Sequence, residues 1–442
     1  MLGLAAAPAK ADRIADLEAE VRQLHEVLTR IEVELKAERQ VRKKAASVTS
    51  SPAINGPEPA HVGVQAAATP PRSAPETAAE GAAAPAQTWP KGYSAVPGTD
   101  TAVKFGGAIR VEAIDDIRSS QGGRTDDATA IPARGTAKAN IGGSLNGSVS
   151  GSRLNFGSLS RTEIGEVKTF LEFDLGPEFS PGFRMRHAYL STGNWLVGQT
   201  WSTIMDMDTV PDELSAGGSV GYGWLRRPQL RYSLKAGDEG RVDLAAEMPN
   251  ADFTGPNAIR TAPDLVVKYS ADPSWGHYAL GGMLRYLRSD TGAGEKADSV
   301  VWGIVGGLGI KTVGEDMVTL QTMDGTGVGT VLNQGSGLSA AVVNGSFHTF
   351  NTYGGTLAYQ HYWGPKLRST LAAGYDHFSN ATDNIGANGL GIRSLASLHA
   401  NLIYSPITAM DVGLEYGYET FRASPAGSGA SSRLIGVVKY GY

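Results

Sequence analysis

The chain ends on the stretch RLIGVVKYGY, residues 433–442, in which every second position is apolar, aromatic or glycine: Leu434, Gly436, Val438, Tyr440 and Tyr442. Arg433 and Lys439 stand between them. Successive side chains of a strand point to opposite faces, so this segment has one apolar and one polar face. From Val103 onward the same alternation recurs about sixteen times, which predicts an all-β fold, a 16-stranded antiparallel transmembrane β-barrel.

Composition agrees with a barrel and excludes other classes of protein. The 442 residues carry a formal charge of −5 and a pI near 5.9, whereas a nucleic-acid-binding domain is usually basic, so we expect no nucleic-acid partner. Mean hydropathy is −0.17, and we find no run of about eighteen apolar residues that would span a bilayer as a helix. The chain has no cysteine, which excludes disulfides and thiol chemistry.

Two regions of different composition precede the predicted barrel. Residues 12–45 carry a heptad repeat with charged residues between its apolar positions, which predicts a coiled coil; a single helix packed on another surface is the alternative. Residues 46–100 are rich in Pro and Ala and have few large apolar side chains, so they predict a flexible linker. The apolar heptad positions are Ile14, Leu17, Val21, Leu24, Leu28, Ile31 and Leu35.

Residues 1–11 (MLGLAAAPAKA) resemble the end of a signal peptide. Ala9-Lys10-Ala11 fits the small-residue pattern of a cleavage site, while a basic start and a full apolar core are missing. A signal-peptide remnant and a disordered terminus explain these residues equally well. The predicted domains are therefore a remnant at 1–11, a coiled coil at 12–45, a linker at 46–100 and a barrel at 101–442.

The strand pattern gives the course of the barrel wall. Connections between predicted strands alternate between short and long, as periplasmic turns and extracellular loops do in outer-membrane barrels. A barrel of about sixteen strands encloses an aqueous channel and not a packed core. The predicted strands are 103–115, 150–160, 166–176, 183–192, 194–202, 223–235, 240–249, 263–271, 277–288, 298–312, 317–324, 348–362, 366–378, 394–404, 409–422 and 431–442.

Alternation along these strands separates a charged face from an apolar face. An Arg or Lys on the lipid face near the midplane costs about 2–4 kcal/mol, so the charged faces must point into the bore. His187 and His361 fall on apolar faces in this pattern, where we expect a packing role. We expect a basic wall from Lys168, Arg184, Arg186, Arg231 and Arg241, and an opposing acidic wall from Glu172, Asp174, Asp411, Glu415 and Glu419.

Residues 203–222 (TIMDMDTVPDELSAGGSVGY) form a long connection after the fifth predicted strand. We expect this loop to fold into the barrel and narrow it, so that its acids lie opposite the basic wall. The alternative is a solvated surface loop whose acids cap local turns. The candidate constriction residues are Asp206, Asp208, Asp212 and Glu213.

The sequence offers no catalytic or cofactor motif of the usual spacing. Asp206, Asp208 and Asp212 depart from the calcium loop of EF-hands, which needs a central Gly and a final Glu, so we expect no metal beyond a weak ion site. Residues 306–312 (GGLGIKT) lack the glycine directly before lysine that a phosphate loop requires. We find neither H-E-x-x-H nor G-x-S-x-G, and therefore expect no cofactor and no enzyme activity.

Four short segments follow the heptad helix and the linker in a set order: VKFGG (103–107), VKTFLEFD (167–174), RHAYL (186–190) and GQTWST (198–203). In this order they resemble the DcaP-like outer-membrane porins. The resemblance implies a trimer of barrels that admits small anionic solutes, dicarboxylates among them, with a periplasmic coiled coil at the N-terminus. It gives functional weight to Arg184, Arg186 and Arg231. The terminal Tyr442 stands where many barrels have Phe.

These observations predict an outer-membrane diffusion porin that passes small anionic solutes such as dicarboxylates through a charged bore narrowed by the loop 203–222. The expected location is the outer membrane of a Gram-negative cell, with the coiled coil in the periplasm. The expected partners are two further copies of the chain in a homotrimer, outer-membrane lipid and lipopolysaccharide, the permeating anions and, through the coiled coil, the cell wall. The alternatives are a structural protein that tethers the outer membrane to the cell wall and, third, a barrel enzyme.

Overall fold

The computed structural model describes residues 89–121, 123–176, 182–250, 253–254, 258–294, 296–335, 339–379, 391–424 and 427–442. The predicted signal-peptide remnant and coiled coil, and the linker up to residue 88, lie outside these residues. Within them, no helix is both long and apolar enough to cross a membrane.

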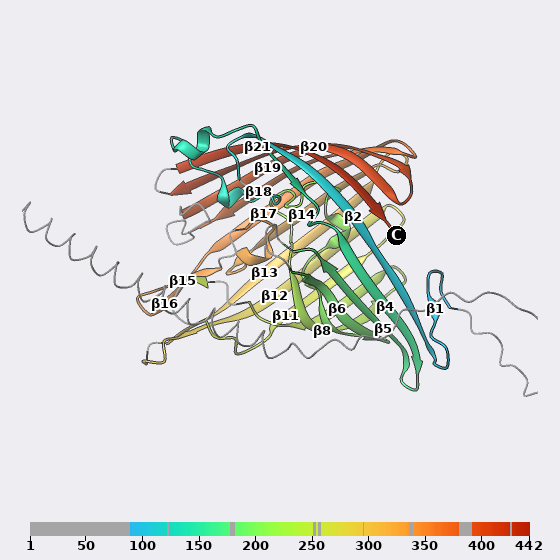
Figure 1. Ribbon diagram of the computed structural model, residues 1–442. Coiled ribbons are helices and arrows are strands. Elements are labelled where there is room, and N and C mark those ends of the chain that lie inside the picture. Colours follow the sequence, from blue (N-terminus) through green and yellow to red (C-terminus); the bar gives the residue numbers. More distant parts are fainter. Residues whose placement is uncertain are drawn as a thin grey trace, which may run out of the picture. The chain divides into compact units, whose positions relative to one another are not determined.

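Most of the chain forms one closed sheet (Figure 1). Pairing of β2 (Thr101–Arg118) with β21 (Gly427–Gly441) closes it. β3 (Ser144–Ser148) and β4 (Arg153–Thr162) lie end to end along β2, and β1 (Ser94–Ala95) is a short addition, so the antiparallel barrel has sixteen strand positions. The other barrel strands are β5 (Gly165–Asp174), β6 (Arg184–Thr192), β7 (Trp195–Trp201), β8 (Arg226–Ala236), β9 (Gly240–Glu247), β11 (Asp264–Ala271), β12 (Gly276–Asp290), β13 (Lys296–Lys311), β14 (Met317–Thr326), β17 (Asn351–Gly364), β18 (Leu367–Phe378), β19 (Gly391–Ile407) and β20 (Met410–Ser424).

The predicted sixteen-stranded antiparallel barrel is confirmed, and each predicted strand overlaps an observed one. The differences lie in the long loops. β3 falls in the predicted loop 116–149, and a three-stranded sheet of β10 (Phe253–Thr254), β15 (Ala340–Val343) and β16 (Ser346–Thr349) falls in two others. These strands are too short to show a period of two. The loops also hold the 3-10 helices η1 (Ala128–Ala130), η2 (Ala137–Asn140), η3 (Met207–Thr209) and η4 (Gly329–Val331).

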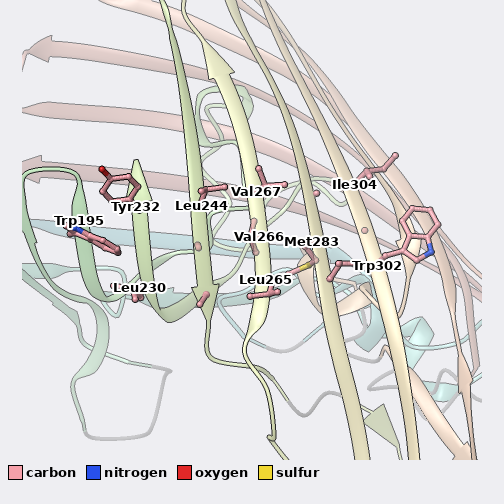
Figure 2. Close-up of a pocket in the computed structure, with 15 residues that line it drawn as sticks. Trp195, Leu230, Tyr232, Leu244, Leu265, Val266, Val267, Met283, Trp302 and Ile304 are labelled. Carbon is pink, nitrogen blue, oxygen red and sulfur yellow. The ribbon is translucent and has the colours of Figure 1, made fainter. Parts of the chain in front are cut away.

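The two faces of the wall differ as the energetic argument requires. Leu280 and Val300 are about two-thirds exposed on the outer face, where lipid would cover them. The outer face also carries an apolar hollow of about 930 Å³ between β7 and β13, lined by Trp195, Leu244, Trp302 and further apolar residues (Figure 2). Because so apolar a surface offers nothing to bind a small anion, the candidate functional site must lie on the inner face.

A β-bulge in β6 changes which side chains of that strand point inward. The register shifts between Glu172 and Phe173 of β5, so that Glu172 pairs with His187 while Phe173 pairs with Met185. A one-residue insertion moves every later side chain to the other face. His187 and Tyr189 therefore face inward, beside Phe170 of β5. The prediction that His187 lies on the apolar outer face is wrong for this reason; His361 does lie with the outward aromatic residues.

The wall differs in height around the barrel. β7, β9 and β11 contain 7, 8 and 8 residues, whereas β12, β13 and β19 contain 15, 16 and 17. At about 3.3 Å per residue and a tilt of about 40°, β7 spans about 18 Å along the barrel axis. The apolar band of an outer-membrane barrel is about 25 Å tall. One side of the barrel is therefore too short to cross the hydrocarbon layer by itself.

Candidate functional site

The connection between β7 and β8, residues 202–225, is anchored to side chains of the inner wall. We call it the inner loop. At its start, Glu247 of β9 accepts hydrogen bonds from Ser202 Oγ and from the backbone N–H of Thr203, both at 2.6 Å. Gln229 of β8 bonds to Thr203 at 2.7 Å. Because these partners leave few polar groups of the first loop residues unpaired, the chain can turn inward there without a large desolvation cost.

The next part of the inner loop lies against β11, β12 and β14. His277 Nε2 lies 3.0 Å from Asp206 Oδ1, and Lys268 Nζ donates to the carbonyl of Met205 at 2.6 Å. Gln321 donates to the carbonyl of Asp206 at 2.8 Å. Burial acts to raise the pKa of Asp206, but the hydrogen bond and charge of His277 outweigh it and the pKa is lowered. Asp206 therefore remains ionised and holds the loop to the wall.

The rest of the inner loop reaches β17–β20. Asp212 accepts from Arg368 Nε at 2.7 Å, and Asn401 donates to the Asp212 carbonyl at 2.8 Å. Glu415 accepts from the backbone N–H of Leu214 at 2.5 Å and of Ser215 at 2.9 Å. A β-carbon at Gly221, which has φ +97°, would lie 2.2 Å from the carbonyl oxygen of Gly355, so only glycine fits this close approach.

Two further loops pack on the inner loop. Asn333 of the loop 327–350 donates to the carbonyls of Gly217 and Ser219 at 2.6 and 2.7 Å. Asp126 of the loop 119–143 contacts Ser215 and accepts from Arg433 of β21 at 2.6 Å. Apolar clusters fill the space behind these contacts, since Ile204 and Met205 pack against the inward residues Val266, Met283, Val305 and Met323. One part of the bore is therefore packed protein.

The anchor points lie on β8, β9, β11, β12, β14, β17–β21 and, through the contact of Arg110 with the Leu214 carbonyl, on β2. The inward side chains of β4–β6 therefore face the space that the loops leave. These side chains, with those of β7–β9, form what we call the basic wall. Arg153 pairs with Glu172 at 3.0 Å, and Asp174 holds both Arg184 and Arg186, each at 2.7 Å. Several modest cationic sites in series favour passage of anions better than one tight site does.

The other predicted basic residues continue this wall toward the short-turn end. Lys168 pairs with Glu166 at 2.9 Å, and Arg241 pairs with Asp243 at 3.0 Å. Arg231 faces inward beside Ala245, because it stands opposite that residue in the β8–β9 ladder. All five predicted basic residues thus share the inner face of β5–β9; their role in permeation stays a prediction.

Sequence reasoning missed Arg226. Its Cζ lies 3.2 Å from the ring centroid of Trp201, and its Nε donates to His187 Nε2 at 3.2 Å. Arg226 and Trp201 are the last paired residues of β8 and β7, where the inner loop leaves the wall. A strand end carries no alternation that would place an isolated Arg inside, and the bulge hid the contact with His187.

The structure places the predicted acidic residues differently from the expected opposing wall. Glu415 and Glu419 are buried beneath the loops and contact His399 and Gln334 respectively. Asp411 bonds to Arg368 and Ser405 near the short-turn end. Glu172 and Asp174 belong to the basic wall itself. The expectation of two facing walls of opposite charge is therefore wrong, because folded loops cover one of the two sides.

The four predicted constriction acids also have partners outside the expected basic residues. Asp206 lies at His277 and Asp212 at Arg368. Asp208 is largely exposed, with His277 Nδ1 at 3.9 Å. Glu213 contacts Ser219 within the loop, and burial raises its pKa. The inner loop is thus held by paired acids; whether it sets the narrowest point of the bore stays a prediction.

One group of side chains has the composition of a metal site. Asp206, Asp208 and His277 place ligand atoms within 4.8 Å of one another. Both ring nitrogens of His277 already have carboxylate partners, Asp206 at 3.0 Å and Asp272 at 2.6 Å. Asp212, the third acid of the motif considered above, lies apart at Arg368. The group is accounted for as an ion-paired histidine at the inner wall.

A family model described as DcaP outer membrane protein matches residues 90–442. The crystal structure of the outer membrane channel DcaP of Acinetobacter baumannii is 23% identical, covers 77% of this chain and 97% of its own, and gives a TM-score of 0.70. An anion-selective porin from Comamonas acidovorans is 10% identical over 77% and 100% of the two chains, with a TM-score of 0.51. Salmonella typhi OmpF in complex with daunomycin is 11% identical over 78% and 98%, with a TM-score of 0.50. Comparison with curated proteins gives no match.

Proposed function

The chain belongs to the DcaP outer membrane protein family, and from that premise we propose that it is a diffusion porin for small anionic solutes, dicarboxylates among them. The observation that supports this proposal is that the folded loops cover only part of the inner wall. The inner loop and its two neighbours lie over β11–β20, while the arginines of the basic wall face the remaining space. A solute that enters this space meets guanidinium groups at several heights.

Because their charges are partly neutralised, these arginines can attract an anionic solute without binding it tightly. Asp174 carries one negative charge and contacts both Arg184 and Arg186, so this trio keeps a net positive charge. Solvent screens the group, because the Arg184 side chain is 46% exposed. A carboxylate can therefore replace water at the guanidinium edges and leave again. Cations spaced along one wall would also serve a solute with two carboxylates, which is the basis for including dicarboxylates.

Planar-bilayer recording under a salt gradient tests this function. The wild-type protein should show a reversal potential of the sign that marks anion preference, and added dicarboxylates should interrupt the current. Replacing both arginines (Arg184→Ser with Arg186→Ser) should lower the anion preference, because Asp174 then becomes an unpaired negative charge on the same wall. A wild-type channel with no preference, or a preference for cations, would contradict the proposal.

The uneven height of the wall supports a homotrimer. Irregular backbone at membrane depth is tolerated only against protein or water, yet the irregular residues 248–250 and 258–263 follow the eight-residue β9. Polar outward side chains also occur nearby, since Ser158 and Thr169 bond to each other at 2.7 Å. We place the contact between copies on β5–β9. Val197→Lys on the outer face of β7 should weaken the trimer in native electrophoresis, whereas Thr322→Lys on β14 should leave assembly intact.

Tethering is the second candidate function, and it rests on the heptad repeat of residues 12–45 alone. Deleting residues 12–95 separates the two functions. Loss of envelope integrity with unchanged conductance would favour a tether between the outer membrane and the cell wall. Unchanged envelopes with altered trimer yield would favour simple support of the trimer by a periplasmic coiled coil.

A further inference from the structure

Arg226 differs from its neighbours Arg153, Arg184 and Arg186 in the partner that its guanidinium has. Arg153, Arg184 and Arg186 donate to carboxylates, whereas Arg226 donates to a ring nitrogen of His187 at 3.2 Å. Within the described part of the chain, its Nη2 atom has no hydrogen-bond partner. The charge of Arg226 is therefore not cancelled at contact distance by its hydrogen-bond partner.

The contact with Arg226 assigns the proton of His187. A guanidinium can only donate, so Nε2 of His187 must present a lone pair and cannot carry a proton. The proton of the neutral ring then sits on Nδ1, which lies 3.0 Å from Thr200 Oγ1 and donates to it. Thr200 and Arg226 thus fix both the orientation and the neutral state of His187.

The guanidinium lies over the Trp201 ring, with the Trp224 ring behind it on the same side. Its Cζ lies 3.2 Å from the centroid of the Trp201 ring and 5.6 Å from that of Trp224. The two indoles are themselves 4.4 Å apart. A cation over an indole face is attracted to the negative end of its quadrupole, and Trp is the best ring for this contact. The hydrogen-bond partner and the ring contacts of Arg226 are therefore uncharged, so they do not cancel its charge.

The surroundings of His187 carry an excess of positive charge. Four guanidinium groups and two carboxylates lie near it. Glu172 pairs with Arg153, Asp174 pairs with both Arg184 and Arg186, and Arg226 bonds to His187 itself. The groups that face His187 come from five strands and are Arg153 (β4), Phe170 and Glu172 (β5), Arg186 (β6), Thr200 and Trp201 (β7) and Arg226 (β8).

We propose that Arg226 is the residue that sets the strength of anion preference in this bore, and that neutral His187 is the positioning residue that holds it there. The proposal rests on the proposed function, since it assigns the anion preference to one side chain. Glu172 cancels the charge of Arg153, and Asp174 cancels that of one of Arg184 and Arg186, so Arg226 contributes half of the net charge of about +2 that this group keeps.

Protonation of His187 gives this arrangement a signature that a merely structural contact lacks. An imidazolium has donors on both nitrogens, so Nε2 could no longer accept from Arg226. Two cations would then face each other across the present 3.2 Å contact, with Arg153 and Arg186 nearby. The contact must break, and Arg226 leaves the Trp201 face. Anion preference should therefore change with acidification in the wild-type channel.

The first experiment measures reversal potentials of the full-length protein in planar bilayers at neutral pH, in a potassium chloride gradient. Arg226→Gln should lower the anion-to-cation permeability ratio by up to about tenfold, because one unit charge about 6 Å from the ion in a water-like medium changes the local anion and cation concentrations by about threefold each, in opposite directions. Heat-modifiable mobility in SDS gels checks that the variant barrel is folded. A folded Arg226→Gln channel with the wild-type ratio would overturn the proposal while leaving the anion porin intact.

The second experiment repeats the measurement from about pH 8 to about pH 3, because burial and the nearby guanidiniums disfavour the charged form of His187 and a range suited to a free histidine would stop too early. His187→Gln offers an amide oxygen to Arg226 and does not titrate, so it should keep the neutral-pH ratio and show a weaker pH dependence than the wild type, because the carboxylates of the wall still titrate. His187→Leu offers no acceptor and should show the altered ratio already at neutral pH. His377→Gln, an outward histidine that stacks on Tyr353, is the matched control and should titrate as the wild type does.

These outcomes distinguish a failure of the proposed porin function from a failure of the roles assigned to Arg226 and His187. A wild-type channel without anion preference contradicts the proposed function. An anion-selective wild type whose ratio responds to pH identically in His187→Leu assigns the titration to another group and overturns the role of His187. Equal ratios in His187→Leu and His187→Gln at every pH would do the same.

Discussion

The basic wall of β4–β9 and the covered wall of β11–β20 are built on the same strand alternation, yet their inward charges do different things. On the covered wall, inward acids accept hydrogen bonds from the inner loop, as Glu415 does from Leu214 and Ser215. On the basic wall, Glu247 of β9 also anchors the start of the inner loop, but the inward charges of β4–β6 pair with each other and keep an excess of cations. An inward charge is therefore a pore-lining charge only where no loop lies over it.

The difference between the two walls arises from the unequal lengths of the strands around the barrel. The inner loop leaves the wall after β7, only seven residues above the short turn, so it enters the bore near mid-height. From there it can reach the tall strands opposite, whose inward Gln321, Thr356 and Asn401 offer polar partners. The inner loop therefore covers the inner face of the tall side of the barrel and leaves the short side uncovered.

The largest effect is expected from a substitution that detaches the inner loop from the covered wall. Glu415→Ala would leave two loop N–H groups and His399 without their shared acceptor. Removing one member of a buried charged pair costs about 3–5 kcal/mol. We expect a lower unfolding temperature and a larger, less steady single-channel conductance as the inner loop detaches.

Asp411→Asn is the matched control on the same strand, because the Asp411 side chain is 29% exposed and contacts Arg368 near the short-turn end. It should leave the conductance close to that of the wild type. Equal conductances of Glu415→Ala and wild type would show that the inner loop does not depend on this anchor.

Removing a negative charge from the basic wall should strengthen its preference for anions. Asp174→Asn leaves Arg184 and Arg186 without their shared counter-charge. One unit of charge about 6 Å from the permeating ion changes the local anion concentration by about threefold. The reversal potential under a salt gradient should therefore move further toward anion preference. An unchanged potential would place the ion path away from these two arginines.

Strand alternation is a local property of the chain, so the sequence alone predicts the strands and assigns Arg184, Arg186, Arg231 and Arg241 to the inner face. It does not predict what covers that face. Glu415 and Glu419 stand in the same alternation as Arg186, and only the paths of distant loops make them anchors. The bulge at Arg186 and His187 is equally invisible, because one inserted residue leaves no mark in composition.

A pH-dependent contact on the covered wall offers a smaller effect. Burial and the nearby Glu419 raise the pKa of Asp126 to about 7, against the pull of Arg433. A carboxyl whose pKa is raised in the folded state stabilises that state most when protonated. The stabilisation is present in acid and is lost as the pH rises through about 7. We expect faster proteolytic cleavage of the loop 119–143 above neutral pH, and no such change with pH in Asp126→Asn.

Substitution of Lys168 should have the smallest effect on ion selectivity. It tests how far the basic wall influences permeating ions toward the short-turn end. Its side chain is 57% exposed, and its partner Glu166 is 45% exposed. Exposed pairs are worth about 0–1 kcal/mol, and salt screens them within about 10 Å. Lys168→Gln should therefore change the permeability ratio less than Asp174→Asn does, by under about twofold at high salt. A larger effect than that of Asp174→Asn would move the narrowest part of the path to the short-turn end of β5, away from the inner loop.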